Sequence, residues 1–248
     1  MKRLPIISAL ILTGLSTACA SAHQAHTGGI KAEQQANVLA PFDIIHTKIS
    51  TEGNTAIFHI AVSEKAGSSK PTKIGKLAGS EAFAYVWPTN IDSYEVGFEH
   101  KAGILALAVA THPDFDDTPL FDENRDGKTG NDGNIWHTHW VVLQPNERCG
   151  KGALGVVDIP EGSKPRLPKT WPGLPILLDS PGWQPTINDK TVEVRVPFDD
   201  IGIVNKAQFD GVTAGLRINV DVHAPLFCVV DVFDIASGDL SLPGKVNL

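Results

Sequence analysis

The feature that most constrains the fold is a series of short β-branched runs, each bounded by turn-forming residues. The chain contains 23 glycines and 17 prolines, which disfavour long helices, and no window carries a long apolar stripe at helical spacing. The pattern therefore predicts an all-β protein, an antiparallel β-sandwich of the immunoglobulin-like or jelly-roll-like kind with long Pro/Gly-rich loops. The predicted strands are Asp43–Ser50, Thr55–Ser63, Ala82–Trp87, Ile104–Thr111, Ile135–Gln144, Thr191–Val196, Val212–His223 and Phe227–Ile235.

The N-terminal segment is typical of a bacterial secretory signal peptide. Residues 1–22 have a basic start, a short apolar stretch and a run of small residues, and the apolar part is too short to span a membrane. Two processing routes stay open. Cleavage after Ala22 would release a soluble periplasmic protein, whereas Cys19, which ends a lipobox-like Thr17-Ala18-Cys19, would be lipidated and would anchor an outer-membrane lipoprotein.

The remaining chain divides into two parts. Residues 23–40 are small or polar with little apolar periodicity, which predicts a flexible tether. Residues 41–248 contain no linker-like change of composition and are expected to form a single β-sandwich domain. Within it, the Pro-rich segment 160–181 carries apolar residues that need packing partners, so we expect an ordered loop.

Export determines how the cysteines are interpreted. If Cys19 is removed or lipidated, Cys149 and Cys228 are the remaining pair, and in an oxidising compartment they are expected to form a disulfide. The alternative is two buried thiols.

The charge of the chain favours cations as partners. The formal net charge is −7, and the loss of Lys2 and Arg3 with the signal peptide would bring it to −9. Such a surface repels phosphate backbones, so nucleic acid is not an expected partner. The sequence does not predict a protein partner.

An acid-rich segment between the fourth and fifth predicted strands suggests a calcium site. Asp122, Asn124 and Asp126 occupy the alternating oxygen positions of a D-x-N-x-D-G run, which resembles the first half of an EF-hand calcium loop. The bidentate glutamate of that loop is absent, and the missing carboxylate would come from Asp132, or from Asp114, Asp116 and Asp117 in the preceding turn. A solvated acidic turn with side chain to backbone hydrogen bonds is the alternative interpretation.

The strongest metal-ligand pattern is a histidine pair in the fifth predicted strand. His137 and His139 are two residues apart, so in a strand they share one face and can grip one Zn²⁺, Cu²⁺ or Fe²⁺ ion. The candidate third ligands are His112, then His223, then Asp114. The run His-Thr-His-Trp also resembles a local piece of the α-carbonic anhydrases, and its two histidines resemble those of the cupins; the likeness covers four residues and assigns no family.

These features predict a metal-binding protein that is exported to the periplasm. The first hypothesis is capture or homeostasis of a divalent cation, with zinc or copper at the histidines and calcium at the acidic loop. A metal-dependent enzyme with an open histidine site is the second, and a calcium-stiffened module that binds carbohydrate or protein is the third. Whether an apolar cleft opens onto the metal separates the second from the first.

Overall fold

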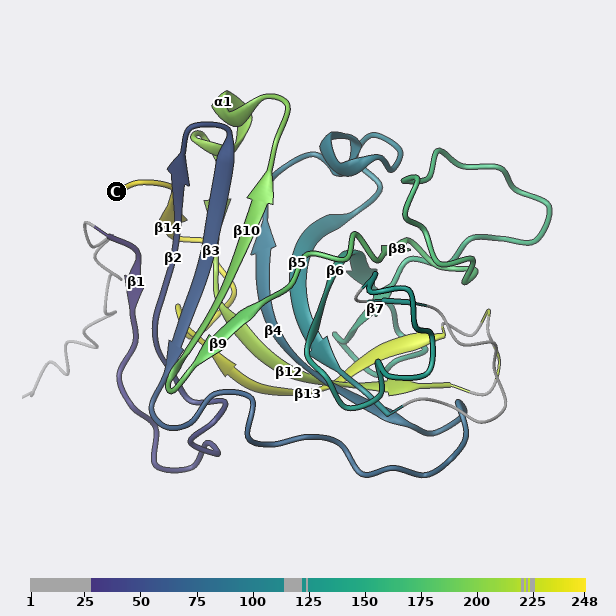
Figure 1. Cartoon of the computed structure of the whole chain (residues 1–248), viewed down its shortest axis with the longest axis horizontal. Coiled ribbons are helices and arrows are strands. Elements are labelled where there is room, and N and C mark those ends of the chain that lie inside the picture. Colours follow the sequence, from purple (N-terminus) through teal and green to yellow (C-terminus); the bar gives the residue numbers. More distant parts are fainter. Residues whose placement is uncertain (1–27, 114–121, 124, 220, 222, 224–225) are drawn as a thin grey trace, which may run out of the picture.

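The fold is built from two antiparallel sheets, of which the larger closes on itself (Figure 1). The computed structural model describes residues 28–113, 122–123, 125–219, 221, 223 and 226–248 of the chain. The predicted signal peptide, Cys19 and the start of the predicted tether lie outside these residues. In the described part of the chain, no helix has the length and apolar character needed to cross a membrane.

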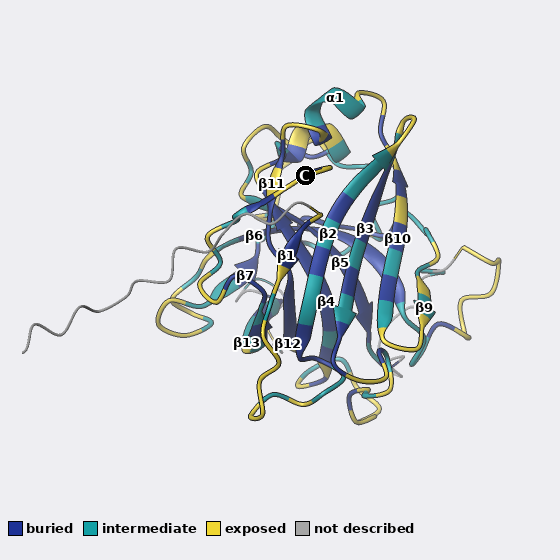
Figure 2. Ribbon diagram, turned by 90° about the vertical axis from the view of Figure 1, so that its left-hand side faces the viewer, coloured by how far each residue is buried: buried dark blue, intermediate teal, exposed yellow. Residues whose placement is uncertain are grey.

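The smaller sheet has five strands in the order β1-β2-β3-β10-β9. Burial alternates along β10, as expected for a strand with one face on the core and one toward solvent. Figure 2, which views this sheet face-on, shows the same alternation of buried and partly exposed residues along β2, β3 and β10. Its strands are β1 (Ile30–Lys31), β2 (Ile44–Glu52), β3 (Thr55–Val62), β9 (Thr186–Asn188) and β10 (Thr191–Pro197).

Six strands of the larger sheet form a closed barrel, in the order β4-β5-β6-β7-β13-β12 and back to β4. The closing contact joins β12 to β4 over six residue pairs, from Val212 opposite Val86 to Arg217 opposite Glu81. The barrel strands are β4 (Glu81–Thr89), β5 (Ile104–Thr111), β6 (His137–Pro145), β7 (Leu154–Val156), β12 (Val212–Ile218) and β13 (Phe227–Ile235). Short strands β8 (Leu178–Asp179), β11 (Gln208–Phe209) and β14 (Gly244–Lys245) extend this sheet, and the helices are η1 (Ser93–Val96) and α1 (Ile201–Val204).

The two faces of β6 belong to two different apolar clusters. Trp140 and Val142 pack with Phe58 and other residues of the smaller sheet, so they join the two sheets. Val141 and Leu143 point the other way and belong to the cluster inside the barrel. Successive side chains of a strand point to opposite faces, so alternate residues of β6 lie in the contact between the sheets and in the barrel interior.

The prediction of an all-β chain with antiparallel sheets is confirmed, and each of the eight predicted strands overlaps a strand of the structure. An immunoglobulin-like or jelly-roll-like sandwich stays a prediction, because the larger sheet closes into a barrel. Part of the predicted tether lies against the domain: Ile30 is buried, and β1 pairs with β2. The Pro-rich segment forms a loop that includes β8, which pairs with β6.

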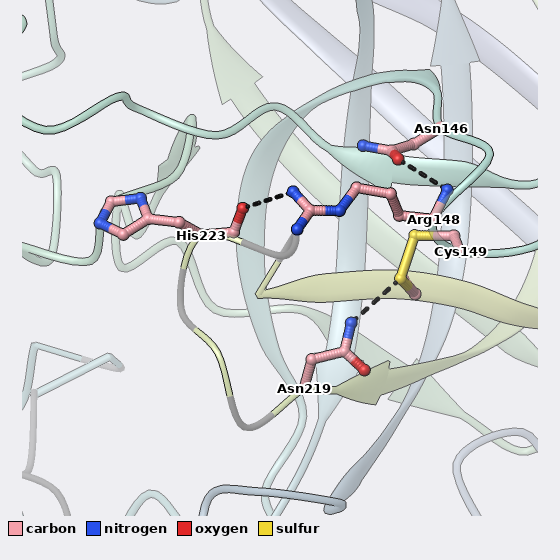
Figure 3. Close-up of a disulfide and its surroundings, with 6 residues drawn as sticks. Asn146, Arg148, Cys149, Asn219 and His223 are labelled. Carbon is pink, nitrogen blue, oxygen red and sulfur yellow. Dashed lines mark hydrogen bonds between the residues drawn. A yellow bond between two sulfur atoms is a disulfide. The ribbon is translucent and has the colours of Figure 1, made fainter.

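The predicted disulfide between Cys149 and Cys228 is present. Cys228 lies on β13, and its pairing with Gly155 is the single residue pair between β13 and β7 among the described residues. Cys149 precedes β7, so the disulfide ties the two strands together where the barrel wall is least paired. Figure 3 shows the bond with two neighbouring contacts: Asn219 Nδ2 reaches Cys228 Sγ at 3.3 Å, and Arg148 donates to the carbonyl of His223.

Candidate metal centre

His137 and His139 open strand β6 on the face that lines the barrel. They are paired with Ala110 and Ala108 of β5, and residues paired across two strands share a face. The same face continues through Val141 and Leu143 into the interior cluster. Both imidazoles are therefore buried beside small side chains, as the period of two predicts for their shared direction.

His112 reaches the same place because it follows the last residue of β5. Asn134 donates its backbone N–H to the carbonyl of His112 at 2.9 Å, which closes the base of the connection between β5 and β6. This connection brings Glu123 back to the histidines. The backbone N–H of Glu123 donates to Asp132 Oδ2 at 3.0 Å, so the acid-rich segment is fixed beside the strand.

Arg125 attaches the other side of this segment to the loop that follows β8. Its Nε and one terminal nitrogen both donate to the carbonyl of Ser180, at 3.1 and 3.0 Å. The hydroxyl of the same serine lies 3.1 Å from His139 Nδ1. Ser180 thus links the segment that carries Glu123 to one of the strand histidines.

The four side chains converge on one point. His112, Glu123, His137 and His139 each offer a ligand atom, and these atoms lie within 4.8 Å of one another. Glu123 Oε2 is 3.0 Å from Nε2 of both His112 and His137, the two imidazole nitrogens are 3.2 Å apart, and Glu123 Oε1 is 3.9 Å from His139 Nε2. Ligands about 2.1 Å from a central tetrahedral ion lie roughly 3.4 Å apart. The cluster has these dimensions, so it could hold a metal ion.

Backbone carbonyls orient two of the three imidazoles. His112 Nδ1 lies 3.0 Å from the carbonyl of Pro113, and His139 Nδ1 lies 3.3 Å from that of Asp179. Because a carbonyl only accepts, Nδ1 carries the proton in the neutral ring and Nε2 keeps a lone pair directed into the cluster. Metal-binding histidines are commonly fixed in this way. His137 Nδ1 has no hydrogen-bond partner among the described residues.

Burial and mutual contact set the protonation states. Burial and the neighbouring His137 lower the pKa of His139 to about 3, so this ring is neutral at ordinary pH, the form that binds metals. Burial alone would raise the pKa of Glu123, but the charges of His112 and His137 and their hydrogen bonds hold this pKa well below its usual value. The result is an ionised carboxylate in direct contact with the imidazoles of His112 and His137, beside the neutral ring of His139.

A cavity of about 430 Å³ inside the barrel reaches the cluster, and His112, Glu123 and His139 all line it. The other described lining residues are apolar or glycine, and they come from β4, β5, β6, β7, β8, β12, β13 and neighbouring loops. One side of the cluster therefore faces an apolar chamber.

The acids of the predicted calcium loop are directed elsewhere. Asp122 accepts hydrogen bonds from the backbone N–H groups of Asp126 and Gly127, at 3.1 and 2.8 Å. Asp126 accepts from the Lys128 N–H and from the Asn131 amide. These contacts match the alternative interpretation of an acidic turn. Asp114, Asp116, Asp117 and Asn124 lie outside the described residues.

The positions of two residues differ from what the sequence predicted. His223, the second candidate for a third ligand, is not in the cluster, and its Nδ1 lies 3.0 Å from Asp158 Oδ1. Glu123 was not among the predicted ligands, because it stands between two oxygen positions of the calcium-loop motif. The sequence did distinguish this residue, because it is the one glutamate among the aspartates of residues 114–132.

Comparison of the chain with protein-family models, with curated proteins and with solved structures finds no match. The class of the site is therefore defined by its own geometry: three histidines and one glutamate, converging at the end of a barrel cavity, that could hold a divalent metal ion.

Proposed function

We propose that this protein is an exported metalloenzyme that holds one divalent first-row transition metal ion with His112, Glu123, His137 and His139. The observation that carries the proposal is the contact between the cluster and the apolar cavity, because small-molecule sites combine an apolar chamber with a few convergent polar groups. A bound ion supplies Lewis acidity there. The chain's own residues hold the ion, orient its ligands and place an apolar chamber on one side of it.

The ligand set favours certain ions. Imidazole nitrogens suit zinc, copper, iron and nickel, and a carboxylate oxygen is compatible with each of them. Calcium prefers six to eight oxygen ligands, so three nitrogens argue against it at this cluster. Zinc and copper are our first assignments. Copper, iron or nickel would keep one or more coordination positions free beside four protein ligands, and zinc would do so by expanding to five.

Export is supported by the signal-like residues 1–22 and by the disulfide between Cys149 and Cys228, since disulfides persist in oxidising compartments. Processing after Ala22 gives a soluble periplasmic protein, and lipidation of Cys19 gives a membrane-anchored one. Mass spectrometry of the mature N-terminus distinguishes the two.

The metal assignment is tested by elemental analysis of protein purified from the periplasm, with and without EDTA. We expect one equivalent of a transition metal in the parent, at least a tenfold loss of bound metal in Glu123→Ala and His139→Ala, and no loss in His223→Ala. Melting temperatures show that the variants are folded. Unchanged metal content in the first two variants would overturn the proposal.

The four protein ligands favour a second candidate function, capture or delivery of the ion without catalysis, because closed tetrahedral sites are usually structural or storage sites. The negative formal charge of the chain is consistent with it. Azide added to protein loaded with Co²⁺ separates the two. A change in the visible spectrum shows an accessible coordination position and supports the enzyme, whereas an unchanged spectrum together with rapid transfer to a chelator supports capture.

A further inference from the structure

Small side chains on three neighbouring strands leave the barrel interior open. Ala214 of β12 is paired with Ala84 of β4, Ala84 with Ala110 of β5, and Ala110 with His137 of β6. Paired residues share a face, so this row of alanines runs around the inside of the wall and ends at a histidine of the cluster. The chamber therefore exists because the residues in this row of cross-strand pairs have small side chains.

The volume of this chamber suits a small molecule. An engineered apolar cavity of roughly 150 Å³ holds benzene, and ligand sites usually measure about 300–1,000 Å³. The barrel cavity, at about 430 Å³, lies in this range. Packed interiors leave few voids larger than a water molecule, so an apolar space of this size is not ordinary core.

The polar side chains that line the cavity are gathered at one end of it. His112, Glu123 and His139 are the described lining residues with polar side chains, and they lie where β6 begins. Leu143 and Val156, which are paired with each other, line the cavity further along the strand. Leu143 is four positions after His139 in the strand, a distance of about 13 Å, so a molecule would meet metal ligands at one end and hydrocarbon over the rest.

We propose that the barrel cavity binds an apolar monocarboxylate, with its carboxylate at the metal and its hydrocarbon tail among the alanines of β4, β5 and β12. A divalent ion held by one ionised glutamate and three neutral imidazoles keeps one positive charge, which favours an anionic oxygen donor as the additional ligand. The apolar walls favour a tail without hydrogen-bonding groups. The position of the head group rests on the proposed function, whereas the site for the tail stands on the cavity alone.

The test measures decanoate binding by calorimetry to the full chain loaded with Zn²⁺ and to the same protein freed of metal. We expect decanoate to bind the loaded protein at least tenfold more tightly than the metal-free protein, and acetate, which lacks the tail, to bind at least tenfold more weakly than decanoate. 1-Decanol, which has the tail without the charge, is expected to bind both forms equally.

A variant that fills the chamber tests the location. Ala84→Leu is expected to weaken decanoate and 1-decanol binding at least tenfold with metal content unchanged, while Ala36→Leu, the same change at an exposed position, leaves both unchanged. Ala214→Val adds less volume to the same row and serves if Ala84→Leu does not fold. Decanoate binding that is insensitive to both filling variants overturns the proposal.

Failure of the metal assignment gives a different result. If the chain binds no metal, yet 1-decanol binds and Ala84→Leu prevents it, the tail site stands and the carboxylate assignment is overturned together with the proposed function. If the metal binds and neither decanoate nor 1-decanol does, the proposed function stands and the inference about the cavity is overturned.

Discussion

His112 and His137 meet at their Nε2 atoms, 3.2 Å apart, although 25 residues separate them in the chain. The hydrogen bond from His112 Nδ1 to the Pro113 carbonyl leaves a lone pair on Nε2 in the neutral ring, and this lone pair points at Glu123 as well. Acceptors this close repel one another unless a proton or a cation lies between them. The arrangement is therefore most stable when a positive charge occupies the centre.

The hydroxyl of Ser180 is expected to contribute to metal affinity through His139. Its Oγ lies 3.1 Å from His139 Nδ1 and helps to fix the ring. Loss of such an outer partner usually weakens binding 10- to 100-fold. Because the Asp179 carbonyl also contacts this nitrogen, we expect about a tenfold loss of Zn²⁺ affinity in Ser180→Ala, measured by competition with a chromophoric chelator.

Ser163→Ala is the matched control, since this serine donates to the carbonyl of Pro160 in an exposed turn. Its affinity is expected to equal that of the parent. Equal affinities in all three proteins would show that Ser180 does not position the ligand.

Replacing a buried alanine by a larger residue should change the free energy of unfolding differently in the two apolar clusters. Ala84 faces the cavity, whereas Ala56 is fully buried in the packed contact between sheets. Overpacking a filled core costs about 1–3 kcal/mol. Ala56→Leu should lower the free energy of unfolding by this amount, and Ala84→Leu should leave it within about 1 kcal/mol of the parent or raise it. Urea unfolding of metal-free protein measures both, and similar losses would mean that the chamber is not available space.

Histidines on the smaller sheet should make stability depend on pH. Burial, together with the charge of Lys48, lowers the pKa of His59 on β3, and burial also lowers the pKa of His46 on β2. The unfolded chain, with histidines near pKa 6.5, then binds more protons than the folded chain below this pH. The free energy of unfolding is therefore expected to fall as the pH drops from 7.5 to 5, by less than about 1.4 kcal/mol per pH unit for each histidine.

The variant His59→Gln isolates the contribution of this histidine to the pH dependence of the unfolding free energy. The variant removes one of the groups that take up a proton on unfolding, so its unfolding free energy should change less over this pH range than that of the parent. Denaturant midpoints of metal-free protein at pH 7.5 and 5 give the comparison. A slope identical to that of the parent would exclude His59 as a contributor.

The disulfide between Cys149 and Cys228 is expected to be a large part of the stability. It closes a loop with a sequence separation of 79 residues, which in the chain-entropy model corresponds to roughly 4 kcal/mol. Reduction, or the double change Cys149→Ser and Cys228→Ser, should lower the free energy of unfolding by about this amount in urea unfolding. Asn219, which contacts Cys228 Sγ, offers a control, since Asn219→Ala keeps the bond and is expected to lose much less.

Local patterns predicted the strands and the histidine pair, and non-local pairing produced the rest. The run from Ile135 to Gln144 showed its period of two directly, so the shared face of His137 and His139 followed from sequence alone. Closure of the barrel depends on Val212 meeting Val86, a contact between segments more than 120 residues apart that no local period encodes. Glu123 was missed for a related reason: its role comes from the turn that folds it back, which the motif at Asp122 concealed.

The wall between β7 and β13 has one further consequence. A single register pair and one covalent link hold these strands together, and that link forms only where thiols are oxidised. Without the disulfide, these two strands would be held together by that backbone pairing and by apolar side chains such as Val156 and Val229, which belong to the same cluster. Oxidation of the two sulfurs would then complete the covalent link across this part of the cavity wall.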